Sequence, residues 1–398
     1  MSTSLEPLLA TREIVVFCGS GGVGKTSIAA ASGVAAAQRI GGKVLVLTID
    51  PARRLADALG LDGIGNMERR VSEDALKTAG VELRGELYVA MLDTKQSWDE
   101  LVLRHAPDEE TAYRILENRL YQNITGRFVQ SHDYIAMERL FELHATGTYD
   151  LIIIDTPPTR HALDFLEAPA RMAEFFGGRL VRWITMPYRV GGKRGARVLN
   201  FASRPFYQVA DRILGSQFLQ DIAEFFLNFQ TMHDGFVQRA RAVEGLLHDR
   251  RTAFAVVTTL EGAPLREAQV FSSELVARRF QLGALVLNKT LPRSLLDADA
   301  DDAARMLRDH SESIAEHVAQ SERPPLEDVS RVARVLRTVA ESFFNFAVVA
   351  TREAELRAEL GRGPEIVADV PNDDRDIHDL EGLARLASHL MGIPSGGC

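Results

Sequence analysis

The sequence has little cysteine: its 398 residues include two, Cys18 and Cys398. Two cysteines cannot form a disulfide framework or a cysteine-based zinc site. Basic residues are also in the minority, with 46 Lys and Arg against 55 Asp and Glu and a net charge of −9. A dedicated nucleic-acid-binding protein is usually basic, so we expect no nucleic-acid partner.

Long apolar runs are missing as well. The chain has no stretch of about 18 uncharged apolar residues, which a membrane-spanning helix needs. The first residues (MSTSLEPLLATRE) lack the basic and then apolar pattern of a signal peptide. With 46% hydrophobic and 25% charged residues, the composition is that of a globular chain. We therefore expect a cytoplasmic globular protein.

Short apolar runs rich in β-branched residues recur along the chain and predict strands. They lie at Glu13–Cys18, Lys43–Asp50, Glu86–Asp93, Leu151–Asp155, Ala253–Thr259, Gly283–Asn288 and Glu365–Val370. Most are apolar on both faces, as strands of a helix-covered parallel sheet are. Helical stretches separate them, so the sequence predicts a doubly wound α/β fold with a mostly parallel sheet.

Two intervals between the predicted strands, at about 95–148 and 160–250, are too long for single crossover helices. Both have helical patterns, for example Asp221–Ala242, where apolar residues recur every three or four positions. We predict one domain over residues 1–398, with an α-helical subdomain built from these two insertions.

A glycine-rich segment, Gly19–Thr26 (GSGGVGKT), matches the Walker A pattern of a P-loop NTPase. It follows a strand and opens an alanine-rich helix over Ser27–Arg39, as the motif requires. Glycines let several backbone N–H groups point at one phosphate, and the helix N-terminus adds its positive end. The residues expected to bind nucleotide are Gly21, Gly22, Val23, Gly24, Lys25, Thr26 and Ser27. The alternative is a glycine-rich turn without a ligand, which the flanking strand and helix disfavour.

Two aspartates, Asp50 in TIDPARR and Asp155 in DTPPTRH, end strands at the same edge of the sheet. A carboxylate at the tip of a parallel strand beside a P-loop can hold Mg²⁺ and its water ligands. We expect Thr26 and Asp155 to hold the metal while Lys25 neutralises the β- and γ-phosphates of ATP. Asp50 is the candidate for orienting the attacking water. A turn or helix cap is the alternative role for either aspartate.

Together these motifs resemble the deviant-Walker-A ATPases of the arsenite-pump (ArsA) and tail-anchored-protein-targeting (GET pathway) family, within the SIMIBI class. SGGVGKT, TIDPARR and DTPPTRHALDFL stand where that family has KGGVGKT, TDPAH and DTAPTGHTLRFL, in the same order. The resemblance implies an ATPase that uses ATP and Mg²⁺. It also implies that Asn288 reads the adenine base and that Pro371 lies in the loop covering it. Glu261 matches a nucleotide-sensing glutamate more loosely.

The family's subunit arrangement implies a second chain. Its members work as dimers in which two P-loops face each other. The arsenite pump carries two P-loops in tandem in one chain. This chain has one, so the resemblance implies a homodimer, or a heterodimer with a homologous ATPase. The CxxC pair that binds zinc at the targeting ATPases' dimer interface is absent, so no zinc is expected. The pump's arsenite-binding cysteine triad cannot be assembled either, which makes an anion-pump subunit the weaker alternative.

The family's signature lysine, which reaches the partner's nucleotide, is Ser20 here. A cation supplied in trans contributes about three to five powers of ten to hydrolysis in comparable NTPases. Arg53 and Arg160 replace a histidine and a glycine of the family motifs, so either is a candidate to supply the charge. The alternative is that both are ordinary surface arginines. The chain would then be a low-activity binding or regulatory subunit that pairs with a homologous ATPase.

Aromatic residues gather in the second insertion, where ten of the 19 phenylalanines lie between Phe165 and Phe236. Within it, residues 175–210 contain seven Arg or Lys and no acidic residue. In the targeting ATPases the corresponding region lines an apolar groove, so the resemblance implies a hydrophobic or membrane-protein client. A helical core with a solvated basic loop is the more common meaning of such a pattern, and it stays open as the alternative.

Overall fold

The computed structural model describes residues 3–49, 65–119, 121–122, 129–157, 232–321, 328–360, 363–373 and 375–393, with 167, 171, 222 and 225–228. Several residues named above lie outside this set, among them Asp50, Arg53, Arg160 and Cys398, as does the basic segment 175–210. Most of the predicted insertion 160–250 lies outside it as well. No helix within the described ranges is long and apolar enough to cross a membrane.

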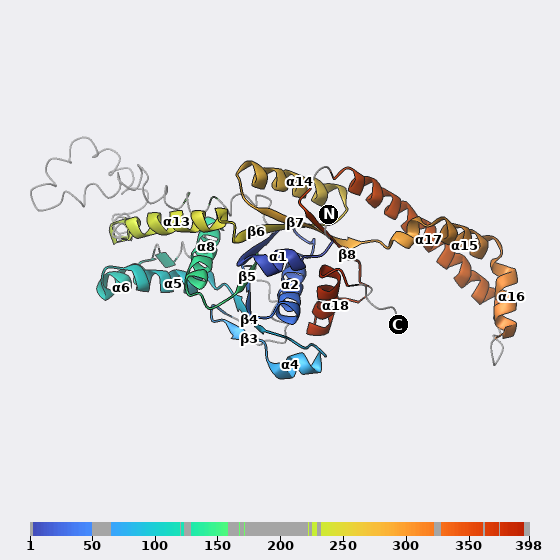
Figure 1. Ribbon diagram of the computed structural model, residues 1–398, viewed down its shortest axis with the longest axis horizontal. Coiled ribbons are helices and arrows are strands. Elements are labelled where there is room, and N and C mark those ends of the chain that lie inside the picture. Colours follow the sequence, from blue (N-terminus) through green and yellow to red (C-terminus); the bar gives the residue numbers. More distant parts are fainter. Residues whose placement is uncertain are drawn as a thin grey trace, which may run out of the picture.

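The described strands form one eight-stranded sheet in the order β3-β4-β2-β5-β1-β6-β7-β8 (Figure 1). They are β1 (Ile14–Cys18), β2 (Lys43–Thr48), β3 (Arg69–Arg70), β4 (Glu86–Met91), β5 (Leu151–Asp155), β6 (Thr252–Thr258), β7 (Leu282–Thr290) and β8 (Ile366–Pro371). Neighbouring strands are parallel except β3 and β4, which pair antiparallel. The predicted α/β fold with a mostly parallel sheet is confirmed.

Both faces of the sheet are covered along most of its strands, which explains why most of them are continuously apolar. Ile14 and Val16 of β1 belong to one core, and Val15 and Phe17 belong to the other. Helices α5 (Thr94–His105), α6 (Glu109–Glu117), α8 (Val129–Ala145), α13 (His233–His248) and α14 (Gly262–Ala277) contribute to the first core. Helices α1 (Glu6–Thr11), α2 (Lys25–Arg39), α4 (Glu73–Thr78) and α18 (Leu380–Leu390) contribute to the second.

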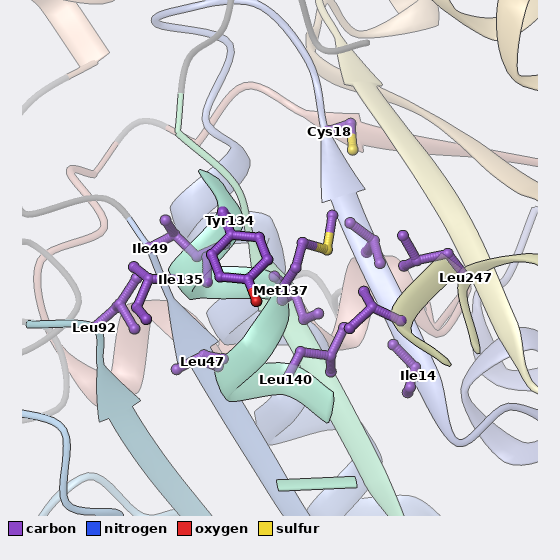
Figure 2. Close-up of a cluster of buried hydrophobic side chains, with 14 of the residues drawn as sticks. Ile14, Cys18, Leu47, Ile49, Leu92, Tyr134, Ile135, Met137, Leu140 and Leu247 are labelled. Carbon is purple, nitrogen blue, oxygen red and sulfur yellow. The ribbon is translucent and has the colours of Figure 1, made fainter. Parts of the chain in front are cut away.

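Helix α8 connects the helices of the first long interval to the strand ends. Its Tyr134 is buried beside Ile49 and Leu92, which follow the C-terminal ends of β2 and β4 (Figure 2). Cys18, at the tip of β1, lies in the same core. The interval 95–148 contains α5, α6 and α8, so it is helical where described. The division of the chain into a sheet and a two-part helical subdomain stays a prediction, because most of the second interval is not described.

A helical arm that the sequence analysis does not predict leaves the sheet between β7 and β8. It comprises η2 (Arg293–Leu296), α15 (Ala298–Asp309), α16 (Ser311–Ser321) and α17 (Val329–Ala358). These helices pack on one another and project away from the sheet (Figure 1). On α17, four apolar side chains between 49% and 55% exposed follow one another at steps of three, four or seven residues: Val335, Val339, Phe346 and Val349.

Candidate functional site

The P-loop (Gly19–Thr26) runs from the buried end of β1 into α2, as its sequence predicts. Gly19 passes so close to β6 that a Cβ atom there would lie 2.1 Å from the carbonyl oxygen of Val257. Gly24 has φ +90°, where an L side chain is strained, and it begins α2 as its N-cap. Glycine is therefore required at both positions by the backbone: Gly19 leaves room for β6, and Gly24 adopts a positive φ. The loop lays the N-terminus of a 15-residue helix at the sheet edge, the arrangement that favours a bound anion.

Lys25 folds back over the loop that precedes it. It is 6% exposed, and its Nζ donates a hydrogen bond to the carbonyl oxygen of Ser20 at 2.7 Å. Thr26 and Ser27 follow in the first turn of α2, where both are half-buried. The structure thus gathers the predicted phosphate-binding residues around one short turn.

Asp155 lies at the tip of β5, between β1 and β2. In the strand register it stands opposite Phe17 and Thr48. The residue is fully buried, and its Oδ2 accepts a hydrogen bond from the Thr48 hydroxyl at 3.0 Å. A buried carboxylate must be hydrogen-bonded or paired with a cation to be tolerated. The position is the one that the sequence analysis assigns to the metal-holding aspartate.

The charges of Lys25 and Asp155 both reach the thiol of Cys18. Burial raises the pKa of Cys18 from 9.0 to about 12, while a hydrogen bond with Thr156 and the charge of Lys25 lower it and the charge of Asp155 raises it. Thr156 is itself fixed, since its hydroxyl donates to the carbonyl oxygen of Phe17 at 2.8 Å. The lysine and the aspartate therefore lie around the tip of β1, near the buried thiol of Cys18.

Asn288 connects β7 to the P-loop. Its Nδ2 donates a hydrogen bond to the carbonyl oxygen of Val23 at 2.7 Å, and the residue is 7% exposed. A Cβ atom on Gly24 would lie 2.3 Å from the same Nδ2. Glycine at position 24 thus leaves the space in which Asn288 lies. The structure places Asn288 against the loop, and its role in reading a base stays a prediction.

A β-bulge interrupts β7 at Asn288 and Lys289. The register with β8 shifts between Leu287 and Thr290, so that two residues of β7 stand opposite one of β8. One of the two is Lys289, which has φ 58° although it is not a glycine. Such a left-handed residue costs about 1–2 kcal/mol. Beyond the bulge, Thr290 stands opposite Pro371, the last residue of β8, so the two predicted base-site residues lie on paired strands.

Other predicted residues are less closely tied to the loop. Glu261 is exposed and holds the N-cap position of α14 without a side-chain cap hydrogen bond. Asp50, the predicted water-orienting residue, lies outside the described residues, as do Arg53 and Arg160. Ile49, just before Asp50, is described, and its N–H donates to the carbonyl oxygen of Asp155 at 3.0 Å.

Sequence reasoning missed two features of this region. The first is the hydrogen bond from Thr48 to Asp155. The position of Thr48 at the end of a strand, two residues before Asp50, could have indicated it. The second is the bulge at Lys289, for which the sequence offered none, because lysine is not a residue that indicates a positive φ.

Comparison with known families matches residues 12–322 to the family described as Anion-transporting ATPase. The chain belongs to this family. A relative from Aquifex aeolicus, whose name assigns it to the driving of an arsenical pump, is 26% identical over 302 residues, covering 72% of this chain and 65% of its own length. ATPase GET3 of Podospora anserina is 21% identical over 315 residues, covering 77% of this chain and 83% of its own length. An ATPase ASNA1 homolog of Entamoeba dispar is 24% identical over 302 residues, covering 73% and 80%.

These matches confirm the ArsA and GET family resemblance. The chain covers just under two thirds of the Aquifex relative's length, and identities of 21–26% are low for carrying over a substrate or a partner.

Proposed function

We propose that the protein is a magnesium-dependent ATPase that acts as a nucleotide-driven switch. The observation that carries the proposal is the junction of β1, β5 and α2, where Lys25 and Asp155 lie around one strand tip beside the P-loop. The names of its relatives support ATP hydrolysis as the reaction class.

Lys25 and the N-terminal turn of α2 would receive the phosphates. The lysine now donates to the carbonyl oxygen of Ser20, so it is already held over the loop by a bond that a phosphate oxygen can replace. The backbone N–H groups of the glycine-rich turn would add further donors. This preorganisation favours the charge that develops on the γ-phosphate during transfer.

Thr26 and Asp155 fit a magnesium site. One supplies a hydroxyl at the start of α2, and the other supplies a buried carboxylate that Thr48 holds in one orientation. Oxygen ligands of this kind suit Mg²⁺, which keeps several waters and binds through one or two protein groups and the phosphates. When bound, the metal would neutralise charge on the β- and γ-phosphates.

Asp50 would orient and partly deprotonate the attacking water. Its support is the position in the sequence, just beyond β2, whose Thr48 stands opposite Asp155 in the sheet. A positioned base typically contributes about two to four powers of ten in rate.

We further propose that two chains face each other across their P-loops, with Arg53 or Arg160 supplying the charge that Ser20 lacks. Family resemblance and the single P-loop support this arrangement. The serine also favours a second candidate, an ATP-dependent binding or regulatory subunit that pairs with a homologous chain carrying the lysine. Dimer formation of the purified protein by itself, with turnover, supports the first; ATP binding without turnover supports the second.

The helical subdomain is the proposed place for a client, and a hydrophobic protein segment is the proposed class. Its support is the resemblance to targeting ATPases and the phenylalanine-rich sequence between Phe165 and Phe236. An arsenite-type pump subunit is disfavoured because trivalent arsenic requires thiolates and the chain has two cysteines, one of them buried at the tip of β1. Stimulation of hydrolysis by arsenite would support the pump instead.

The experiment is steady-state ATP hydrolysis by the purified chain and three variants, Lys25→Ala, Asp155→Asn and Asp50→Asn, over a range of Mg²⁺. The proposal expects magnesium-dependent turnover that falls at least about a hundredfold in each variant. Turnover by all three variants at the wild-type rate would contradict the proposed site. Normal turnover by Asp50→Asn alone would overturn only the assignment of the water-orienting residue.

A further inference from the structure

The last turns of α17 touch the ends of two strands. Glu353 accepts a hydrogen bond at 3.0 Å from the backbone N–H of Leu291, which follows β7. Four residues later, Arg357 makes a bidentate contact with Asp369 of β8, with Nη–Oδ distances of 2.6 and 2.5 Å. Residues four apart lie on the same face of a helix. One face of one helix turn therefore holds both segments.

These two segments carry the predicted base-site residues. Leu291 comes just after the bulge that contains Asn288 and the left-handed Lys289. Asp369 stands opposite Leu287 in the sheet and precedes Pro371 by two residues. The bulge interrupts the regular pairing of β7 with β8 at Asn288 and Lys289, and pairing resumes at Thr290 and Pro371. Contacts from outside the sheet can therefore add support where the regular pairing is interrupted.

Helix α17 can give that support because its C-terminal end is anchored in the core. Leu356, between the two contact residues in the sequence, is 8% exposed and belongs to the core that includes α8 and α14. A bidentate guanidinium–carboxylate contact fixes orientation as well as distance, unlike a single point-charge contact. Binding residues keep their geometry only when such neighbouring groups hold them.

We propose that Glu353 and Arg357 are positioning residues for the base end of the nucleotide site, holding Asn288 and Pro371 at the separation that the base of ATP requires. The inference rests on the proposed function and adds the groups that set base recognition. It also assigns the last turns of α17 to the nucleotide site, while the rest of the helical arm projects away from the sheet.

To distinguish this positioning role from a purely structural one, we compare the affinities of the protein for two ligands. They are Mg-ATP and magnesium tripolyphosphate, which lacks a base. The variants are Glu353→Ala and Arg357→Ala, with Glu353→Gln, which keeps an acceptor oxygen, and Arg357→Lys as conservative partners. The matched control is Arg352→Ala, which removes the exposed ion pair to Glu355 on the same helix. Thermal melts of every variant verify folding. If an alanine variant does not fold, Arg357→Lys, which cannot make the bidentate contact, takes its place.

The affinity for ATP is expected to fall about five- to tenfold in the alanine variants, as when a charged hydrogen bond no longer holds a binding group. Affinity for tripolyphosphate is expected to stay at the wild-type value, and Glu353→Gln to restore most of the ATP affinity. Equal losses for both ligands, or no loss for ATP while the wild-type protein binds it, would overturn the inference alone. Failure of the wild-type protein to bind ATP would overturn the proposed function and this inference with it.

Discussion

The hydroxyl of Thr48 donates a hydrogen bond to Oδ2 of Asp155 at 3.0 Å, between the tips of two adjacent parallel strands. Both residues are at most 1% exposed, so bulk water does not compete for the bond. The threonine thus contributes to the orientation of the carboxylate at this strand tip.

Replacing Thr48 by valine removes the hydroxyl and keeps the shape of the side chain. We expect the free energy of unfolding to fall by about 1.5–3 kcal/mol, the usual worth of a hydrogen bond to a charged group. We also expect half-maximal ATPase activity to require more Mg²⁺, because Asp155 loses its orientation. Denaturant unfolding and a Mg²⁺ titration measure the two effects. The control is Thr48→Ser, which keeps the hydroxyl and should keep the wild-type Mg²⁺ requirement. An unchanged Mg²⁺ requirement in Thr48→Val would contradict the account.

Gly24→Ala tests the contact between the P-loop and Asn288. The new methyl group meets both a φ of +90° and the Asn288 amide at 2.3 Å. We expect a loss of stability of about 2–4 kcal/mol from backbone strain and overpacking together. Gly80→Ala is the control, since Gly80 has φ +66° and no atom within 4 Å of the new methyl group. It should cost about 1–2 kcal/mol from strain alone. Equal losses in the two variants would show that the Asn288 contact does not constrain position 24.

The thiol of Cys18 should be inert in the folded protein. Burial raises its pKa to about 12, and the thiolate is the reactive form. In a Cys398→Ser background, which leaves Cys18 as the remaining cysteine, we expect iodoacetamide to label the protein at pH 8 only after unfolding. Rapid labelling of the native protein would contradict the buried position.

The same raised pKa predicts how stability depends on pH. Below the ordinary thiol pKa of 9.0 both the folded and unfolded states hold the proton, so the contribution of Cys18 does not change there. Between 9.0 and about 12 the unfolded state releases the proton first, so the free energy of unfolding falls as the pH rises. Cys18→Ala should reduce this alkaline slope, and an equal slope in both proteins would contradict the assignment.

Ser20→Lys restores the residue that the family places before the glycines. Lys25 bonds to the backbone oxygen of residue 20, so this contact does not depend on the side chain that changes. We expect turnover to rise at least about tenfold if the missing charge limits hydrolysis. Steady-state turnover with a dimer assay measures the effect.

Arg53→Ala and Arg160→Ala provide the complementary test. If one arginine supplies the charge, its removal lowers turnover, and Ser20→Lys in that background restores it. No loss in either single variant would exclude both arginines as substitutes.

Most of the strands could be predicted because they are apolar on both faces, a pattern that a buried parallel strand requires. The antiparallel β3 could not, since two exposed arginines, Arg69 and Arg70, carry no strand pattern. The helical arm could have been inferred from spacing alone: the interval between Asn288 and Glu365 is too long for one crossover helix. Its helices pack mainly on one another, an arrangement that the length of the interval does not reveal.

In the candidate site, too, some residues could be predicted from the sequence and others could not. Lys25, Thr26 and Asp155 follow from motifs whose chemistry fixes both residue type and spacing. The contacts of Glu353 and Arg357 join residues 62 and 12 positions apart, in segments of ordinary composition. Only the folded chain brings such groups together.

The central claim is that triphosphate and magnesium bind together where β1 passes into α2. Isothermal titration of ATP into the wild-type protein, with and without Mg²⁺, tests it most directly, with Lys25→Ala as the variant and the exposed Lys77→Ala as the control. We predict heat of binding that requires Mg²⁺, persists in Lys77→Ala and disappears in Lys25→Ala. Magnesium-independent heat, or equal heat in Lys25→Ala and the wild-type protein, would contradict the account.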